Sequence, residues 1–316
     1  MPAPSERLML LDTASLYFRA FFGVPDSLKA PDGTPVNAVR GLLDFITRLV
    51  TDYHPTHLAC CWDNDWRPQW RVDLLPSYKA HRVETELATA KPGGAHFEEE
   101  VPDPLEVQIP VIRAVLEAFG IAVVGADGFE ADDVIGTLAT GAGMPVEVVT
   151  GDRDLFQLVD DDAEVRVLYT ARGVGRHERV TNDVIRDKYG IDGRQYADFA
   201  ALRGDPSDGL PGVPGVGEKT AASLLRRFGD LQGLVAAAED PGSDLAPGPR
   251  RKVRDAEDYL LAAPEVVRVV RDLELGSPDM TLPRTPSDPD RLVELNERWG
   301  LGGSVTRLVE ALTDLS

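Results

Sequence analysis

Val146-Glu147-Val148-Val149-Thr150-Gly151-Asp152 is a short, mostly apolar strand pattern that ends at a glycine and an aspartate. Residues 8–12 and 56–63 have the same form, an apolar strand followed directly by an aspartate, and residues 121–124 are a further apolar run. The stretches between them have helical periodicity, at residues 36–53, 105–119 and 131–140. Apolar strands that alternate with helices are typical of a mainly parallel sheet with helices on both faces. We therefore expect an α/β fold.

Acidic residues follow the predicted strands. Asp12, Asp63 and Asp152 each come directly after a strand, and in parallel sheets ligands bind beyond the carboxyl ends of the strands. We therefore expect these acids to converge at one edge of the sheet. Together with neighbouring acids and two from the C-terminal half, the candidate metal ligands are Asp12, Asp63, Glu130, Asp132, Asp133, Asp152, Asp154, Asp205 and Asp208. Carboxylates suit Mg²⁺, and two such ions roughly 3.5–4 Å apart hydrolyse phosphodiesters without a nucleophilic side chain.

Each acid taken alone also has an ordinary structural interpretation. An aspartate after a strand often caps a helix or forms a turn. Glu130, Asp132 and Asp133 open a predicted helix, where the helix dipole favours negative charge. Three acids within four residues nevertheless repel one another unless a cation lies between them. The expected convergence is what favours a metal-dependent nuclease over scattered caps.

Composition fits a globular protein of 316 residues with 43% hydrophobic and 27% charged residues. The sequence has no apolar run of membrane-spanning length and no signal peptide, so we expect a soluble, cytoplasmic, nucleoid-associated protein. Cys60 and Cys61 are interpreted as small buried strand residues. A net charge of −20 opposes binding to nucleic acid. Basic residues are nevertheless clustered locally, at Arg67, Arg71, Lys79 and Arg82, at Lys219, Arg226 and Arg227, and at Arg250, Arg251, Lys252 and Arg254.

After about residue 194 the strand patterns end, and helices with Gly- and Pro-rich turns follow. Residues 209–222 read Gly-Leu-Pro-Gly-Val-Pro-Gly-Val-Gly-Glu-Lys-Thr-Ala-Ala. This is not a nucleotide-binding P-loop, because Glu218 separates the last glycine from the lysine and no strand leads into it. A tight hairpin whose amides bind a phosphate fits better, and a plain interhelical turn is the alternative. We expect an α/β core at residues 1–194 and a helical DNA-binding subdomain at 195–316, with a helix-hairpin-helix motif at 205–230.

In their order along nearly the whole chain, these motifs resemble the bacterial 5′-nuclease, or flap endonuclease, family, best known as the amino-terminal domain of DNA polymerase I. They are Leu-Leu-Asp12-Thr, Trp-Asp63, Tyr78-Lys79-Ala80-His81-Arg82, Glu130-Ala-Asp-Asp133-Val-Ile-Gly, Thr150-Gly-Asp152-Arg-Asp154, Gly204-Asp205-Pro-Ser-Asp208 and Leu210-Pro-Gly-Val-Pro-Gly-Val-Gly-Glu-Lys219-Thr-Ala. The resemblance implies a structure-specific 5′–3′ exonuclease and 5′-flap endonuclease that acts on flapped, nicked or gapped DNA in replication and repair. Because no polymerase sequence follows, we expect a free-standing monomer that works with a DNA polymerase and a ligase.

The resemblance also implies residue roles. Two or more Mg²⁺ or Mn²⁺ ions would be held by Asp12, Asp63, Glu130 and Asp132 at one position and by Asp152, Asp154, Asp205 and Asp208 at the other, with Asp133 between. Lys79 and Arg82, at the foot of a helical arch spanning about residues 73–118, would stabilise charge at the scissile phosphate. Arg19 would lie near that phosphate, and Tyr78 would stack a base. The hairpin residues implied to bind DNA are Gly212, Val213, Gly215, Val216, Gly217, Lys219 and Thr220, and in some members hairpin carbonyls also bind K⁺.

One segment departs from the family pattern. Residues 83–100 form an insertion in the expected arch, with glutamates at positions 84, 86, 98, 99 and 100. Acidic side chains there would slow the entry of a polyanionic single strand that passes close by. We expect the insertion to act as an electrostatic gate or a flexible extension.

Two other function classes stay open. The first is a catalytically inactive DNA-junction-binding protein, which the complete set of acids disfavours. The second is a metal-dependent ribonuclease of a related small-domain type. The hairpin subdomain and the length of the chain disfavour that reading.

Overall fold

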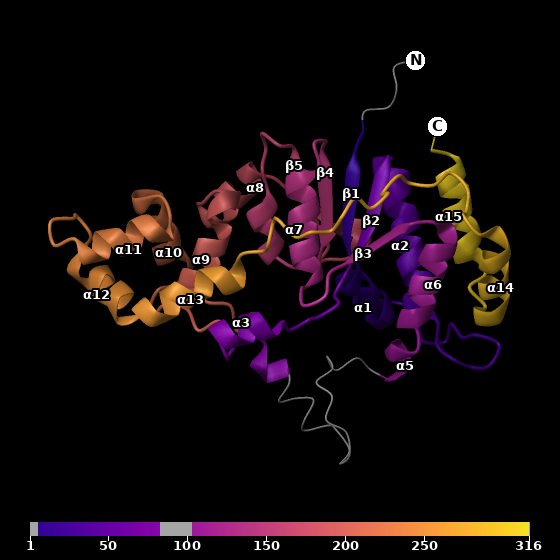
Figure 1. Cartoon of the computed structure of the whole chain (residues 1–316), viewed down its shortest axis with the longest axis horizontal. Coiled ribbons are helices and arrows are strands. Elements are labelled where there is room, and N and C mark those ends of the chain that lie inside the picture. Colours follow the sequence, from indigo (N-terminus) through magenta and orange to yellow (C-terminus); the bar gives the residue numbers. More distant parts are fainter. Residues whose placement is uncertain (1–5, 83–102, 316) are drawn as a thin grey trace, which may run out of the picture.

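A six-stranded sheet forms the centre of the computed structural model, which describes residues 6–82 and 103–315 (Figure 1). The strand order is β3-β2-β1-β4-β5-β6. The strands are β1 (Leu8–Asp12), β2 (His57–Trp62), β3 (Ala122–Gly125), β4 (Val146–Thr150), β5 (Val165–Tyr169) and β6 (Glu178–Val180). Neighbouring strands pair in parallel except β6, which is antiparallel to β5. The predicted mainly parallel α/β fold is confirmed.

The two faces of the sheet pack against different helices. In β1, Leu8 and Leu10 belong to one hydrophobic core, whereas Met9 and Leu11 belong to the other, as the two-residue period of a strand requires. The first core is completed by α7 (Ala131–Gly141), α8 (Asn182–Tyr189), α9 (Tyr196–Arg203), α10 (Glu218–Phe228), α11 (Leu231–Glu239), α12 (Pro247–Asp255) and α13 (Glu257–Val267). The second is completed by α1 (Thr13–Gly23), α2 (Asn37–Tyr53), α6 (Ile109–Phe119), α14 (Pro289–Trp299) and α15 (Gly303–Thr313).

The strands and helices predicted in the first 150 residues are present, with one difference. Residues 105–119 form two helices, α5 (Asp103–Glu106) and α6, rather than one. Several short elements were not predicted, among them α1, α3 (Gln69–Leu74), β5 and β6. The remaining short elements are the 3-10 helices η1 (Asp154–Leu158), η2 (Val174–Arg176), η3 (Gly193–Gln195) and η4 (Pro206–Asp208). The arch insertion at residues 83–100 lies outside the described residues.

The last helices pack on the α/β core, whereas we expected all residues after 194 to belong to the helical subdomain. After α13 an extended segment runs back along the core and pairs with the start of β2, where Leu58 N donates to Met280 O at 2.8 Å and Leu282 N to Thr56 O at 2.9 Å. Helices α14 and α15 then pack on α6 and α2. The apolar sides of α14 and α15 are buried against this part of the core. In the structure, the helical subdomain extends from α9 to α13, and the residues after α13 belong with the core.

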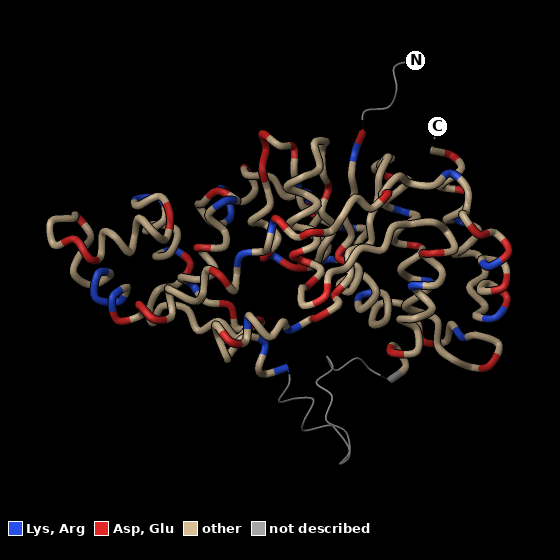
Figure 2. The backbone as a smooth tube through the Cα atoms, viewed as in Figure 1, with Lys and Arg blue, Asp and Glu red and all other residues tan. Residues whose placement is uncertain are grey.

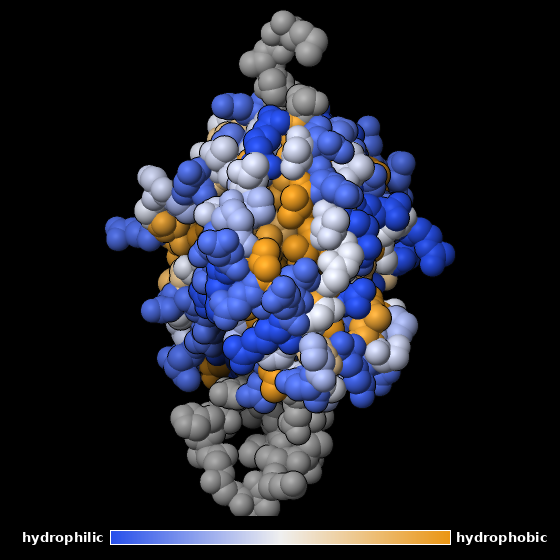
Figure 3. All heavy atoms as spheres, turned by 90° about the vertical axis from the view of Figure 1, so that its right-hand side faces the viewer, coloured by the Kyte–Doolittle hydropathy of each residue, from blue (hydrophilic) through white to orange (hydrophobic). Residues whose placement is uncertain are grey.

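The face that α14 and α15 present to solvent is mostly hydrophilic around a narrow apolar strip (Figure 3). Within residues 6–82 and 103–315, no helix is both long enough and apolar enough to cross a membrane.

Candidate active site

A pocket of about 400 Å³ lies where the carboxyl ends of the central strands meet. Acidic segments are concentrated around this lower edge of the sheet (Figure 2). Six of the nine predicted metal ligands line it, together with two predicted catalytic residues: Asp12, Asp63, Glu130, Asp132, Asp152, Asp205, Lys79 and Arg82. The predicted convergence of sequence-distant acids is therefore present in the structure.

Asp12 is held at the end of β1 and the start of α1. Its carboxylate accepts hydrogen bonds from Ser15 N at 3.1 Å and from Thr150 Oγ1 at 2.7 Å. Ser15 Oγ in turn accepts from Gly151 N at 3.0 Å. Burial raises the pKa of Asp12 to about 6, against the lowering effect of these hydrogen bonds. The residue caps a helix and also lines the pocket, so the two interpretations of this acid are compatible.

Asp63 and Asp132 are each repelled by other acids of the same pocket. Asp63 accepts a hydrogen bond from Ala131 N at 2.7 Å. Its pKa rises to about 7 because of burial and the nearby Asp12. The pKa of Asp132 lies well above its ordinary value because of burial and then the charges of Asp152 and Asp12. Crowded, buried carboxylates of this kind are stabilised by a bound cation.

Glu130 accepts hydrogen bonds from three side chains of the arch base. Tyr78 Oη donates to Glu130 Oε1 at 2.7 Å, Arg71 donates to the same oxygen at 3.1 Å, and the Lys79 ammonium donates to Oε2. Burial alone would lower the pKa of Lys79, but the Glu130 carboxylate overrides this and raises it well above its usual range. Lys79 has a φ of 50°, an uncommon backbone conformation for a lysine. Tyr78 is only 5% exposed, so the structure does not place its ring for the predicted base stacking.

Asp133 lies outside the pocket in a buried ion pair with Arg71. Arg71 donates to both of its oxygens, at 2.7 and 2.9 Å. The same oxygens accept from Val270 N at 2.9 Å and Glu130 N at 3.2 Å. With both oxygens used in this way, Asp133 is not among the acids that the structure gathers. Arg71 is 2% exposed, and nothing in its local sequence indicates this buried role, since the sequence shows it only as one of a cluster of basic residues.

The second acid group is only partly in the pocket. Asp152 Oδ1 accepts from Asp154 N at 2.8 Å. Asp205 caps η4 through Ser207 N at 2.9 Å and pairs with Arg203 at 2.9 Å. Asp154 and Asp208 are buried and are not part of the pocket lining.

Burial of Asp154 and Asp208 has electrostatic consequences. The pKa of Asp154 is raised well above its usual value by burial and by Asp152. Burial raises the pKa of Asp208 to about 6, although Lys79 and Arg82 oppose this. Arg82 donates to Asp208 Oδ1 at 3.1 Å. In the second group, Asp152 and Asp205 therefore line the pocket, whereas Asp208 contacts Arg82 from outside the lining.

The donor set of the pocket fits hard divalent cations, because every candidate ligand is a carboxylate oxygen. The side chains are turned toward protein donors, and within the described part of the chain no three His, Cys, Asp or Glu side chains stand in an arrangement that could hold a metal ion. The chemistry of the site fits Mg²⁺ or Mn²⁺. The carboxylates that line the pocket would have to rotate toward one another to bind one ion together.

The predicted hairpin joins α9 to α10. Asp205 and Leu210 form a β-bridge, and Val213 N donates to Leu202 O at 2.9 Å. Gly212 has a φ of 69°, and a Cβ there would lie 2.6 Å from backbone atoms of Arg203, so only glycine fits. Val213 and Val216 are buried core residues, and their backbone N–H groups donate within the protein, to Leu202 O and to Val213 O. Neither their side chains nor their amides are therefore free for a phosphate. The other implied DNA-binding positions lie in the same turn or at the start of α10, namely Gly215, Gly217, Lys219 and Thr220.

Arg19 is the predicted catalytic residue that is not itself part of the acid-pocket lining. It lies one turn beyond Ser15 on α1, at the border of that pocket, because its Nη2 would be 3.4 Å from a Cβ on Gly151, which lines the pocket. Its Nη1 donates to Ala171 O at 3.4 Å.

Known proteins resemble the chain over its whole length. Residues 7–190 match the model of the 5′-3′ exonuclease N-terminal resolvase-like domain, and residues 191–290 match that of the 5′-3′ exonuclease C-terminal SAM fold. A 5′-3′ exonuclease of Streptomyces coelicolor is 62% identical over 96% of this chain and 100% of that protein. One from Mycobacterium tuberculosis is 52% identical, covering 98% of each. The structure of the bacteriophage T5 D15 flap endonuclease with DNA and metal ions has a TM-score of 0.65 at 16% identity, over 98% of this chain and 99% of that chain. The chain belongs to the 5′-3′ exonuclease family, as its sequence motifs predict.

Proposed function

We propose that this protein is a metal-dependent, structure-specific 5′ nuclease that hydrolyses DNA phosphodiesters at the acid pocket, acting on 5′ flaps and on nicked or gapped duplexes. One observation carries the proposal: six carboxylates from five separate parts of the chain line one pocket together with Lys79 and Arg82. The names of the similar proteins support it, since they include 5′-3′ exonucleases and a flap endonuclease solved with DNA and metal ions.

The acids that line the pocket would hold two or more Mg²⁺ or Mn²⁺ ions, with the buried Asp154 and Asp208 outside the lining completing the second group. The lining acids are Asp12, Asp63, Glu130, Asp132, Asp152 and Asp205. When bound, such ions supply Lewis-acid chemistry, activating water and stabilising charge on the phosphoryl oxygens. The protein contributes the remaining electrostatics. Lys79 and Arg82 present positive charge to the pocket, and the arch-base contacts hold that charge in place before the substrate arrives.

The hairpin would hold the duplex. Its backbone amides and the start of α10, with Lys219 and Thr220, form a phosphate-binding turn next to Asp205. Binding of K⁺ by hairpin carbonyls belongs to the same proposal. We expect the protein to act as a monomer near the chromosome, in the cytoplasm, together with a DNA polymerase and a ligase.

A substrate panel tests the function. A 5′-flap DNA, its RNA counterpart and a blunt duplex are each incubated with Mg²⁺, Mn²⁺ or a chelator, and the products are mapped to the nucleotide. The proposal predicts cleavage of the DNA flap with either metal, at the junction, and none with the chelator. Preferential cleavage of RNA would indicate a ribonuclease instead, and tight flap binding without cleavage under any condition would indicate an inactive junction-binding protein.

A further inference from the structure

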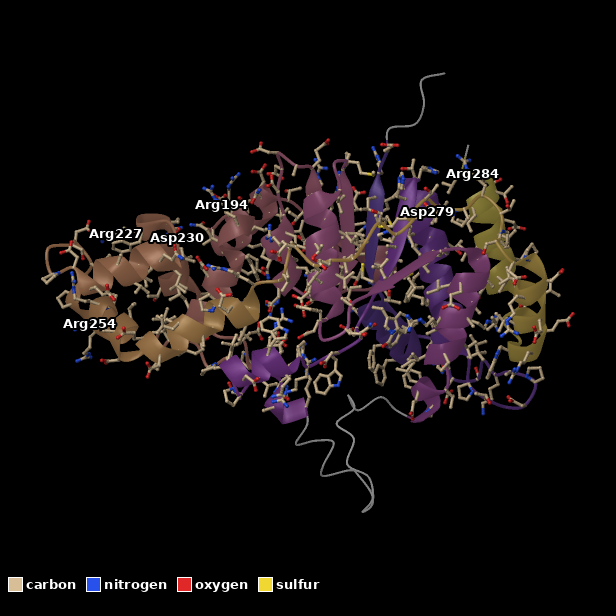
Figure 4. The ribbon with its side chains drawn as sticks, viewed as in Figure 1. Arg194, Arg227, Asp230, Arg254, Asp279 and Arg284 are labelled. Atoms are coloured by element: carbon tan, nitrogen blue, oxygen red, sulfur yellow. The ribbon has the colours of Figure 1, made fainter. Side chains whose placement is uncertain are left out.

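A short extended segment after α13, which we call the strap, lies against α7 and η1. It comprises residues 268–273, and beyond it the chain passes Asp279 and reaches the amino-terminal edge of the sheet (Figure 4). The strap belongs to none of the six strands, so its backbone must find hydrogen-bond partners elsewhere. Three of its N–H groups donate to side chains of the core: Val269 N to Gln157 Oε1 at 3.1 Å, Val270 N to Asp133 Oδ1 at 2.9 Å and Leu273 N to Thr137 Oγ1 at 3.2 Å. The strap and the segments that carry these side chains therefore hold one another in place.

On one side the strap sits directly on α7. A Cβ on Gly136 would lie 2.6 Å from Val270 O and 2.7 Å from Val269 Cγ2, so only glycine allows this close approach. The two side chains of α7 that bind the strap come from positions one helical turn apart. The same helix follows directly after Glu130 and carries Asp132 in its first turn. The strap therefore holds the helix that presents one group of pocket acids.

On the other side the strap is tied to η1 through Gln157. This side chain is only 4% exposed. Its Nε2 donates to Val267 O at 3.0 Å and to Asp154 O at 2.9 Å, while its Oε1 accepts from the strap. Arg271 of the strap donates in return to Gln157 O at 2.9 Å. Because η1 begins at Asp154, two residues after Asp152, the strap also holds the segment that presents the second group of acids.

The strap thus gives two groups of acids a common anchor. These groups repel each other, since the charge of Asp152 contributes, after burial, to the raised pKa of Asp132. Two divalent cations about 3.5–4 Å apart need ligands from both groups at a set separation, and a displacement of about 0.5 Å is enough to impair such a site. Acids that repel each other from two different segments stay at that separation only if something holds both segments.

We propose that the strap positions the two groups of metal-binding acids relative to each other, and that Gln157 is a positioning residue through which it does so. The inference rests on the proposed metal-dependent function and deepens it, because it names what sets the spacing of the acids. Neither Gln157 nor Gly136 lines the acid pocket. An effect of either residue on metal binding must therefore pass through the elements that it holds.

The first test compares two buried glutamines. Gln157→Ala removes the tie between η1 and the strap. Gln108→Ala is the matched control, because Gln108 is 1% exposed and also bonds to backbone on two sides, accepting from Ala38 N at 2.9 Å and donating to Pro104 O at 2.9 Å. Mg²⁺ binding to the full chain without DNA is measured by isothermal titration calorimetry, and stability by urea unfolding in chelator.

Both glutamine variants should be less stable than the parent, because each leaves buried backbone groups without partners. Only Gln157→Ala should also lose Mg²⁺ affinity. The loss should be about tenfold or more, the usual effect of removing a group that supports a metal ligand from behind. In single-turnover cleavage of a 5′ flap, the Mg²⁺ concentration for half-maximal rate should rise by a similar factor. The rate at saturating Mg²⁺ should fall less, because every acid is still present.

The second test compares two glycines of α7. Gly136→Ala pushes the strap off the helix, whereas a Cβ on Gly141 meets nothing within 4 Å, so Gly141→Ala is the control. Alanine favours a helix over glycine at both positions, and only the contact with the strap differs. Gly136→Ala should weaken Mg²⁺ binding in the same calorimetric titration, and Gly141→Ala should match the parent.

Mg²⁺ affinity equal to that of the parent in Gln157→Ala and in folded Gly136→Ala would overturn the inference and leave the strap a structural connection only. Equal losses of affinity in Gln157→Ala and Gln108→Ala would also overturn it, since affinity would then follow stability. If Gln157→Ala does not fold, the pair of glycine variants decides the question. A parent that binds no Mg²⁺ and cleaves no DNA with Mg²⁺ or Mn²⁺ would instead contradict the proposed function, which is a different and recognisable result.

Discussion

At the scale of single residues, Arg71 joins three parts of the molecule. Its guanidinium bonds to Glu130 and Asp133 at the start of α7 and donates to Val266 O, at the end of α13, at 3.0 Å. Arg71 itself belongs to α3, at the base of the expected arch. The acid pocket, the helical subdomain and the arch base are therefore held in register by one side chain.

Arg71→Ala should strongly destabilise the protein. The substitution removes the ion-pair partner of the buried Asp133 and one of the two cations that contact Glu130, and breaking a buried ion pair from one side costs about 3–5 kcal/mol. Urea unfolding measures the change. Arg113→Ala is the control, because Arg113 is half-exposed and forms a surface ion pair with Glu117 at 3.7 Å and a cation–π contact with Trp62, so its loss should cost about 1 kcal/mol. Equal effects of the two substitutions would show that the Arg71 network contributes little.

Lys79→Ala or Arg82→Ala should each slow single-turnover cleavage by about 10²-fold or more, with a smaller loss of affinity. Both residues line the acid pocket, where a preorganised positive charge stabilises the transition state. Rapid-quench measurement of a bound 5′ flap gives the rate directly. Arg284→Ala is the control and should cleave at the rate of the parent, because Arg284 is exposed and does not line the acid pocket. A variant whose affinity falls while its bound-state rate is preserved would reassign that residue as an ordinary phosphate contact.

At the scale of elements, the hairpin depends on backbone that only glycine adopts. Gly212→Ala should reduce DNA affinity for every substrate and lower stability, since the new methyl group would meet the backbone of Arg203 at 2.6 Å. Gly141→Ala is the control, because a Cβ there meets nothing within 4 Å at the end of α7. Thermal unfolding and nicked-duplex binding of both variants test this. Normal DNA binding by a folded Gly212→Ala protein would remove the hairpin from the binding surface.

The sequence predicts elements well where the pattern is long and apolar. β1, β2, β4 and α2 all have near-continuous or periodic apolar residues, and all appear within a residue or so of the expected bounds. The short elements are different: β6 has three residues, too few for a period to appear. The return of α14 and α15 to the core is set by long-range packing on α6 and α2, which local sequence does not encode.

The candidate site, like the fold, could be predicted only in part from the sequence. That acids at strand ends converge follows from parallel topology, and six of the nine do line one pocket. Sequence spacing does not say which acids face a pocket and which face a buried partner. Asp133 and Asp132 are adjacent in α7, but Asp133 faces Arg71 whereas Asp132 lines the pocket. The contacts of Arg71 with Asp133 and of Arg203 with Asp205 could not be predicted from the sequence, because they join residues that only the fold brings together.

At the scale of the whole molecule, the crowded carboxylates couple stability to pH. Burial raises the pKa values of Asp12 and Asp63 to about 6 and about 7, from 3.8. A carboxyl whose pKa is raised by folding favours the folded state while protonated, and that contribution is lost as the pH rises through the folded-state value. In chelator, the urea midpoint should therefore fall as the pH rises from about 4, near the unfolded-state pKa of these carboxyls, to about 7, the folded-state pKa of Asp63.

Metal and substitution should both oppose this loss of stability. Mg²⁺ binds deprotonated carboxylates, so it should raise the midpoint more at the alkaline end of the range than at the acidic end. Asp63→Asn should flatten the pH dependence, whereas Asp290→Asn, exposed in the first turn of α14, should not. A steep dependence retained in Asp63→Asn would show that this carboxyl does not titrate in the range.

The central claim is that the acid pocket cleaves DNA while the hairpin holds it, and the most direct measurement compares Asp152→Asn with the parent on one 5′-flap substrate. Asp152 lines the pocket, and asparagine keeps its shape while removing a charge. Single-turnover cleavage in Mg²⁺ and binding in chelator are measured on the same preparation, with Asp290→Asn as control. The account predicts that Asp152→Asn has no measurable cleavage while its affinity stays within about tenfold of the parent, roughly 1.4 kcal/mol. Cleavage by Asp152→Asn at the parent rate in low Mg²⁺ would contradict it.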